Sequence, residues 1–200
     1  LGQCHRRRYP SKTATIRPGD QANILYYIID GSLTVLTEDD EGRELILAYI
    51  NRGEFIGEMG LFVETPRREV VVRTRTACEL AEISYERLFQ LFEGPLREEC
   101  PKILFAIGSQ LSNRVLHTSR KVSRLAFMDV TSRVAKTLID LCSEPDSLSH
   151  PKGTQIRISR QEISRIVGCS REMVGRVLKQ LEEEGMISVN GKTIVVFGTR

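Results

Sequence analysis

Residues 159–185, SRQEISRIVGCSREMVGRVLKQLEEEG, contain the start and stop signals of two consecutive short helices. Ser159 is followed three residues later by Glu162, a capping-box pattern in which each side chain satisfies an exposed amide at a helix start. Gly168 is placed to end this first helix, and Ser170 is a favourable N-cap for a second one. Two short helices joined by a tight turn that contains glycine predict a helix-turn-helix.

The second of these helices has an apolar stripe and a charged face. Its apolar residues recur at helical spacing, which predicts their burial: Val174, Val177, Leu178 and Leu181. Arg171, Glu172 and Arg176 lie on the other side, near the N-terminus of the helix. Arginine can bind O6 and N7 of guanine, and glutamate can accept from N4 of cytosine. The three residues are therefore candidate base readers, although a solvated surface helix carries similar charges.

The segment that follows alternates as a β-hairpin does. Its apolar residues are Ile187, Val189, Ile194 and Val196. They flank Asn190-Gly191, the dipeptide most typical of a two-residue hairpin turn in which both residues have positive φ. A hairpin directly after a helix-turn-helix predicts the wing of a winged helix.

The N-terminal part, residues 9 to about 85, consists of short runs rich in β-branched and aromatic residues, such as LYYII, LTVLT, LILAYI and EVVVRT. Turn signals separate these runs, and Gly42 is expected to close the hairpin loop EDDEGRE. This pattern predicts an antiparallel β-roll or barrel, so the whole chain belongs to the α+β class.

A long helix is expected after the loop that Gly94, Pro95 and Pro101 mark. Its apolar seam follows steps of three and four with one slip between positions 111 and 115. The residues of the seam are Leu104, Ile107, Leu111, Val115, Thr118, Val122 and Leu125. A narrow seam of this kind favours self-association through a two-helix contact. The alternative is packing against the chain's own β domain.

Composition narrows the function classes. The 200 residues carry a net charge of only +3, so binding to nucleic acid must rest on local clusters of charge. The apolar runs are shorter than the ~20 residues of a membrane span, so we expect a cytoplasmic protein. Five scattered cysteines without a C-x-x-C predict reduced thiols and no metal site. The chain begins with Leu, so we expect a native segment to precede it.

The motifs RQEISRIVGCSREMVGRVLKQLEEEG, GEMGLF, TACELAEISY and LAFMDVTSRVAKTL closely resemble the CRP/FNR family, to which the catabolite activator protein (cyclic-AMP receptor protein) belongs. The resemblance covers almost the whole chain. It implies a cyclic-nucleotide-binding β-roll (jelly-roll-like) over residues 1–100, a dimerisation helix over 101–127 and a winged helix-turn-helix over 128–200. The expected protein is a homodimeric transcription regulator, active on a two-fold operator related to TGTGA.

The resemblance also implies roles for single residues. Arg171, Glu172 and Arg176 are the implied base readers. The residues implied near DNA phosphates are Thr131, Arg160, Ser170 and Lys179. The loop SLSHPKGTQ resembles the surface through which the family contacts RNA polymerase, with His150, Lys152 and Gly153 as the contact residues. The loop is also readable as a plain connector.

A second candidate site lies in residues 54–72, EFIGEMGLFVETPRREVVV. Gly57 lets a ligand approach the backbone, Glu58 can accept from a ribose hydroxyl, and Arg68 can pair with phosphate. A tight turn beside surface arginines is the alternative. The resemblance assigns these three residues to the nucleotide, with Thr118 and Ser119 of the long helix meeting the base across a dimer.

Glu69 departs from the cyclic-AMP pattern, which has a serine that donates to the phosphate at this position. A carboxylate only accepts hydrogen bonds and repels an anion, so we expect weak binding of cyclic AMP. Glu at this place, with the added loop FEGPLREECP, resembles the CAP-like protein (Clp) branch, regulators of virulence genes that respond to cyclic di-GMP. We therefore expect cyclic di-GMP to inhibit DNA binding. Cyclic AMP as an activator, or no small ligand, are the alternatives.

Two rival classes are disfavoured. A nucleotide hydrolase with Glu58 as its base would need a second carboxylate, a metal cluster or a nucleophile-histidine pair, and none accompanies Glu58 in the sequence. A redox or haem sensor of the FNR type would need an N-terminal cysteine cluster. We therefore expect no catalytic activity, and no cofactor apart from the nucleotide effector.

Overall fold

In the computed structural model, which describes residues 2–64 and 67–199, the chain forms two compact units. The first unit extends to Thr118 and the second begins at Ser119. The boundary falls inside one long helix, α2 (Cys100–Phe127). None of the helices within the described ranges is long and apolar enough to cross a membrane.

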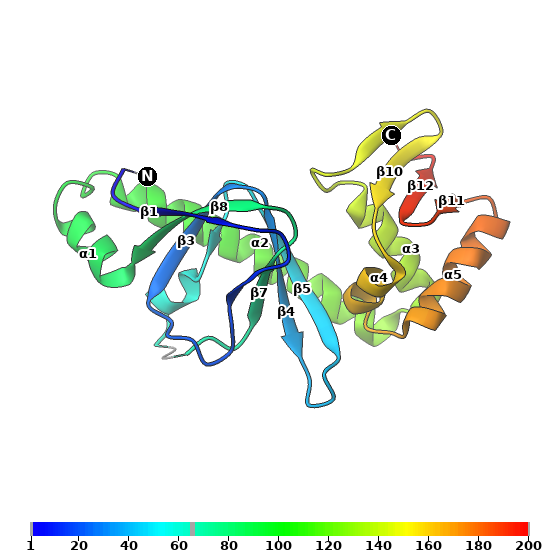
Figure 1. Ribbon diagram of the computed structural model, residues 1–200, viewed down its shortest axis with the longest axis horizontal. Helices are drawn as coiled ribbons and strands as arrows, with labels where there is room; N and C mark the ends of the chain where they lie inside the picture. Colours follow the sequence, from blue (N-terminus) through cyan, green and yellow to red (C-terminus); the bar gives the residue numbers. More distant parts are fainter. Residues whose placement is uncertain (1, 65–66, 200) are drawn as a thin grey trace. The chain divides into compact units, whose positions relative to one another are not determined.

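The first unit is a roll of two four-stranded antiparallel sheets (Figure 1). Their strand orders are β1-β8-β3-β6 and β2-β7-β4-β5. The strands are β1 (His5–Tyr9), β2 (Ala14–Ile16), β3 (Ile24–Asp30), β4 (Ser32–Glu38), β5 (Glu44–Asn51), β6 (Phe55–Ile56), β7 (Val71–Thr74) and β8 (Cys78–Ser84). The predicted β-roll is confirmed, and β4 and β5 form the expected hairpin with Gly42 in its loop at φ 76°.

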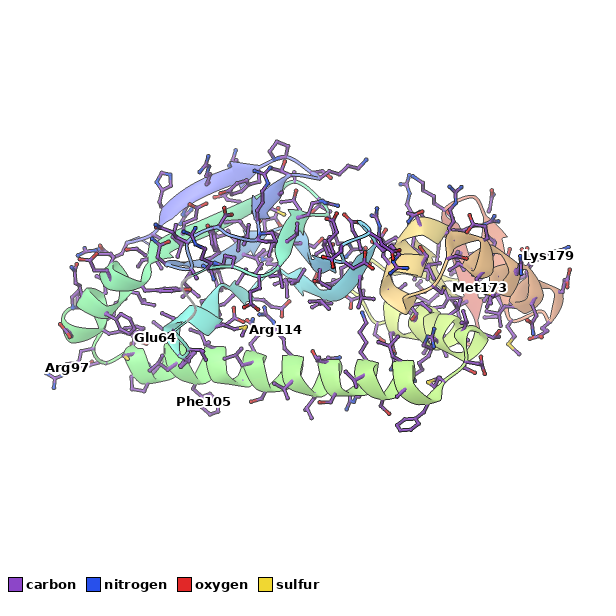
Figure 2. All side chains as sticks on the ribbon, turned by 90° about the horizontal axis from the view of Figure 1, so that it is seen from below. Glu64, Arg97, Phe105, Arg114, Met173 and Lys179 are labelled. Carbon is purple, nitrogen blue, oxygen red and sulfur yellow. The ribbon has the colours of Figure 1, made fainter. Side chains whose placement is uncertain are left out.

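Two helices pack on this roll. α1 (Tyr85–Glu93) is capped by Ser84, whose Oγ accepts from the Arg87 amide at 3.2 Å. α2 carries Pro101 in its first turn, where a proline removes no hydrogen bond. Leu25, Leu88 and Ile107 form a buried cluster that joins β3, α1 and α2. Because Ile107 is fully buried there, the first part of α2 is held along the side of the roll (Figure 2).

The predicted seam of α2 is corrected, because Ile107 faces the roll and Leu111 lies between the face on the roll and the outer face. Ile107 and Leu111 pack on the cluster of the roll, so the alternative of packing against the chain's own β domain holds for these two. Val115 and Val122 remain 63% and 60% exposed. With Gly108 in place of Ile107, the outer row alternates steps of four and three without a slip. Its members are Leu104, Gly108, Leu111, Val115, Thr118, Val122 and Leu125.

The second unit contains the predicted helix-turn-helix. It consists of α3 (Val130–Leu141), β9 (Leu148–His150), β10 (Gly153–Arg157), α4 (Arg160–Val167), α5 (Arg171–Glu183), β11 (Ile187–Asn190) and β12 (Thr193–Phe197). The two N-caps are confirmed: Ser159 Oγ accepts from the Glu162 amide and Ser170 Oγ from the Met173 amide, both at 3.1 Å. Gly168 ends α4 with φ 68°. The predicted stripe of α5 is buried.

The wing hairpin is present, but its turn differs from the prediction. Asn190 is the last residue of β11 and pairs with Thr193. The two-residue loop is therefore Gly191-Lys192, and of the two only Gly191 has positive φ, at 61°. Positive φ at the first loop residue alone is the type II′ pattern. The dipeptide rule located the hairpin correctly but shifted its turn by one residue.

Candidate functional site

The first candidate site is built around a buried carboxylate in the first unit. β6 ends at Ile56, and Gly57 then turns the chain with φ 87° into a short 3-10 helix, η1 (Glu58–Leu61). A Cβ atom on Gly57 would lie 2.6 Å from the Ile24 carbonyl oxygen and 2.9 Å from Nη2 of Arg68. Because Gly57 has no Cβ atom, the guanidinium of Arg68 has room to approach this turn. The side chain of Glu58 is only 3% exposed.

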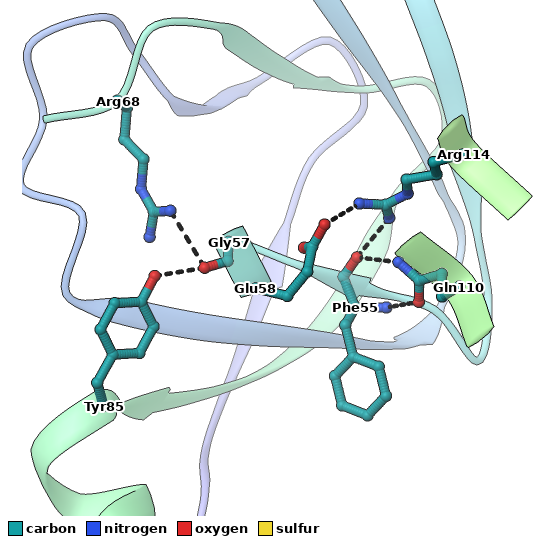
Figure 3. Close-up of polar contacts among 7 residues, drawn as sticks. All are labelled: Phe55, Gly57, Glu58, Arg68, Tyr85, Gln110 and Arg114. Carbon is teal, nitrogen blue, oxygen red and sulfur yellow. Dashed lines mark hydrogen bonds and ion pairs between the residues drawn. The ribbon is translucent and has the colours of Figure 1, made fainter. Parts of the chain in front are cut away.

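Two residues of α2 hold this segment (Figure 3). Arg114 forms an ion pair with Oε1 of Glu58 and donates to the Phe55 carbonyl at 2.5 Å. Gln110 binds the same backbone twice, accepting from the Phe55 amide at 2.7 Å and donating to its carbonyl at 2.8 Å. A buried carboxylate needs a partner cation and further hydrogen bonds to be stable. Here α2 supplies the cation.

Arg68 approaches the same turn from the other side. Its guanidinium donates to the carbonyls of Ile24 at 2.6 Å and Gly57 at 3.4 Å. The Tyr85 hydroxyl also donates to the Gly57 carbonyl, and burial raises the pKa of this tyrosine. The structure thus brings Gly57, Glu58 and Arg68 together. It gives the two charged side chains partners within the chain.

One atom of the site lacks a partner. Oε2 of Glu58 is buried and accepts no hydrogen bond from the residues that the structure describes. Burying a carboxylate oxygen without a donor is unfavourable, so this atom is suited to a donor that a ligand brings, such as a hydroxyl. Arg114 occupies only the other oxygen of the same carboxylate.

Within the described ranges, the remaining residues assigned to the nucleotide form no hydrogen bond or ion pair with this cluster. Glu69 is exposed, and among the described residues it has no ion-pair partner. The nearby Arg67 donates to the Gly19 carbonyl at 2.7 Å. Thr118 and Ser119 are exposed on α2. Their contact with a base across a dimer stays a prediction.

Sequence reasoning missed Tyr85, Gln110 and Arg114. For the two helical residues a signal was present. Gln110 and Arg114 follow the buried Ile107 by three and seven positions, so all three lie on one face of the helix. Polar residues in line with a buried one indicate a buried polar contact. No comparable pattern marked Tyr85, because its contact with Gly57 joins segments 28 residues apart.

The second candidate site is the outer face of α5. Val174 is fully buried, and Val177, Leu178 and Leu181 are at most 4% exposed. This packing presents Arg171, Glu172 and Arg176, the predicted base readers, to solvent. Among the described residues none forms an ion pair with these three, so their charges are available to a ligand.

The residues predicted near phosphates lie on the same unit. Ser170 caps α5, and the guanidinium of Arg160 is close enough to Gly175 that a Cβ there would lie 3.6 Å from Nη1. Lys179 is exposed beside Glu183 at 3.6 Å, and Thr131 is half-buried near the start of α3. Arg160 therefore extends the charged face of α5 toward the start of α4.

The predicted polymerase contact lies around the β9–β10 turn. Lys152 is exposed, and its amide donates to Nδ1 of His150 at 3.2 Å. Gly153 is buried, and a Cβ there would lie 2.0 Å from the Val196 carbonyl oxygen. This glycine is needed for the sheet itself. A contact of the loop with RNA polymerase stays a prediction.

Comparison with known protein families identifies one domain in each of the two units. A family profile for the cyclic nucleotide-binding domain matches residues 6–94, and one for the Crp-like helix-turn-helix domain matches residues 132–197. The CRP-like protein Clp of Xanthomonas euvesicatoria pv. vesicatoria is 60% identical over 200 residues, which cover 100% of this chain and 87% of that protein. Clp of Xanthomonas campestris pv. campestris is likewise 60% identical over the same shares.

Solved structures of related regulators share the fold of this chain. The structure of the c-di-GMP-responsive global regulator CLP of Xanthomonas campestris, described as linking cell-cell signalling to virulence gene expression, is 60% identical. It has a TM-score of 0.94 and covers 99% of this chain and 96% of its own. A CRP/FNR-family transcriptional regulator of Thermus thermophilus shares the fold, with a TM-score of 0.78 at 23% identity over 96% of this chain and 93% of its own.

Removing the cation from Glu58 should destabilise the first unit. We expect Arg114→Met to lower its free energy of unfolding by about 3–5 kcal/mol, because a buried carboxylate loses its counter-charge. Adding Glu58→Gln in the same chain should restore most of the loss. The measurement is thermal denaturation followed by circular dichroism. An equal loss in the single and double variants would contradict the role of the ion pair.

Gly57 should be more sensitive to a side chain than Gly53, which has nearly the same φ, 87° against 89°. Backbone strain of about 1–2 kcal/mol is common to both Gly→Ala variants. Only Gly57→Ala adds a clash with Ile24 and Arg68, which should cost about 1–3 kcal/mol more, because nothing lies within 4 Å of a Cβ at Gly53. Thermal denaturation of both variants tests this difference, and equal melting temperatures would refute it.

Proposed function

Because this chain belongs to the CRP/FNR family of transcription regulators, in the branch of the CRP-like protein Clp, we propose that it acts as a homodimer on a two-fold operator related to TGTGA. The proposal is supported by three exposed residues in the first two turns of α5, a helix whose apolar stripe is buried. They are Arg171, Glu172 and Arg176. In a helix-turn-helix, these first turns of the second helix enter the major groove.

The chemistry of these three residues suits an operator with G·C pairs. The two arginines pair with guanine edges and the glutamate accepts from cytosine. Glu172 would only weaken a purely electrostatic attraction to phosphates, so its place on this face supports sequence reading. Thr131, Arg160, Ser170 and Lys179 serve as phosphate contacts that set the register of the helix.

The proposed homodimer forms along the outer row of α2. Four of its apolar members are exposed: Leu104 is 37%, Val115 63%, Val122 60% and Leu125 39% accessible, whereas Leu111 is half-buried against the roll. Their regular heptad spacing is the pattern of a two-helix contact. Gly108 lies in this row, and nothing is within 4 Å of a Cβ at that position. A second α2 can therefore approach closely at Gly108.

The proposed effector is cyclic di-GMP, which inhibits DNA binding. Within the chain Glu58 pairs with Arg114, and Arg68 donates to the carbonyls of Ile24 and Gly57, so a phosphate that binds Arg68 has to compete with these contacts. The relative described as c-di-GMP-responsive supports this choice over cyclic AMP. A ligand shifts an equilibrium only through different affinities for two arrangements. We propose that the ligand-free arrangement binds DNA and that the nucleotide prefers the other.

Specific binding should occur without any nucleotide. In a gel shift we expect the purified full chain to bind a TGTGA-like duplex at least tenfold tighter than a scrambled one, and cyclic di-GMP to weaken that binding. Arg171→Ala and Arg176→Ala should each cost about 1–3 kcal/mol of this discrimination, because each removes a bidentate contact to guanine. A requirement for micromolar cyclic AMP would overturn the proposed mechanism.

Replacing Glu69 by Ser should strengthen the binding of cyclic AMP. Two like charges ~4 Å apart oppose each other by roughly 4 kcal/mol at an effective dielectric of ~20. Because Glu69 is exposed, solvent screening reduces this term, and we expect a gain of about tenfold in calorimetry. Glu64→Ser, the same charge change at another exposed position, is the control. An equal response of the two variants would mean that Glu69 does not face the phosphate.

Gly108 provides a test of the dimer. Gly108→Leu should raise the dissociation constant of the dimer at least tenfold, because the new side chain separates the two helices where they are expected to approach most closely. Ser109→Leu adds a similar side chain to a position outside the outer row and should leave it unchanged. Analytical ultracentrifugation of both variants measures the effect. A dimer that tolerates Gly108→Leu would place the contact elsewhere.

A further inference from the structure

Met173 is exposed where an apolar side chain is unexpected. The apolar residues of α5, all described, are Met173, Val174, Val177, Leu178 and Leu181. The last four are buried, whereas Met173 is 37% exposed and lies in the first turn of the helix (Figure 2). It directly follows Arg171 and Glu172. Met173 is therefore not part of the buried stripe through which α5 packs on its unit.

Met173 is poorly suited to hydrogen bonds with DNA. Its backbone amide is already used, because it donates to Ser170 Oγ at 3.1 Å. Its thioether has no hydrogen to donate and is a weak acceptor, so the side chain serves neither a phosphate nor the edge of a guanine. The neighbouring charged residues can make those contacts.

The major groove has one apolar feature that a side chain can read, the C5-methyl group of thymine. We infer that Met173 is a further specificity-determining residue, which contacts the methyl group of one thymine in the half-site. An unbranched, flexible and polarisable side chain can adjust to this target. Contact removes both apolar surfaces from water, which is favourable in proportion to the area buried. Arg171, Glu172 and Arg176 then read G·C pairs while Met173 reads a T·A pair.

The size of the effect follows from the loss of one methyl group. Deoxyuridine differs from thymidine only by that group. Burial of a methyl or methylene is worth about 0.8 kcal/mol, so one substitution at the contacted position should weaken binding about fourfold. The same substitution should have no effect when the side chain that reads the methyl is absent.

The experiment is a set of duplexes in which each thymine of one half-site is replaced in turn by deoxyuridine. Their affinities are measured for the full-length wild type, Met173→Ala and Met173→Leu by fluorescence anisotropy. We expect one position at which the wild type loses about fourfold and Met173→Leu keeps a penalty, whereas Met173→Ala binds both duplexes equally. Met186→Ala is the control, since Met186 is 54% exposed outside α5, and it should behave as the wild type.

The outcomes separate this inference from the proposed function on which it rests. Met173→Ala is used only if its circular dichroism and melting temperature match the wild type; otherwise Met173→Gln, which keeps the length of the side chain, replaces it. A wild type without a penalty at every position, or an equal penalty in wild type and variant, overturns the role of Met173. Failure of the wild type to distinguish a matched from a scrambled duplex overturns the proposed function instead.

Discussion

The ion pair between Glu58 and Arg114 is the contact on which the first unit depends. A carboxylate with a side chain only 3% exposed is stable there because α2 places a guanidinium against it. The same arginine and Gln110 bind the backbone of Phe55, so α2 holds the turn at Gly57 by charge and by hydrogen bonds (Figure 3). Ile107 adds the apolar part of this attachment. A change at Glu58 therefore alters a contact that holds α2 against the roll.

This arrangement gives the proposed regulation a physical basis. α2 is one continuous helix from Cys100 to Phe127, and its residues belong in part to each unit. A ligand hydroxyl can add to the unpaired Oε2 of Glu58. A phosphate at Arg68 competes with the carbonyls of Ile24 and Gly57. Such a ligand can shift the protein only if it favours another arrangement of these partners. The proposed inhibition follows if the nucleotide favours an arrangement in which Arg68 has left these carbonyls.

In the second unit, packing determines which charged residues are exposed. Burial of Val174 and its neighbours fixes the rotation of α5, and this rotation exposes Arg171, Glu172 and Arg176 together. The caps at Ser159 and Ser170 fix where the two helices begin. Met173 lies at the border between the buried stripe and the charged face. It is the one apolar side chain of α5 that a groove can reach.

The sequence by itself determined the local elements: the two capped helices, the β-roll, the wing and the charged face of α5. Each depends on periodicity and caps within a few residues, which a single sequence displays. Tertiary structure decided the rest. Whether Ile107 or Gly108 continues the outer row of α2 depended on which face the roll buries, since both fit a spacing of three to four. Arg114, the ion-pair partner of Glu58, lies 56 residues away, and Tyr85 lies 28 residues from Gly57, so only the packed fold could bring them together.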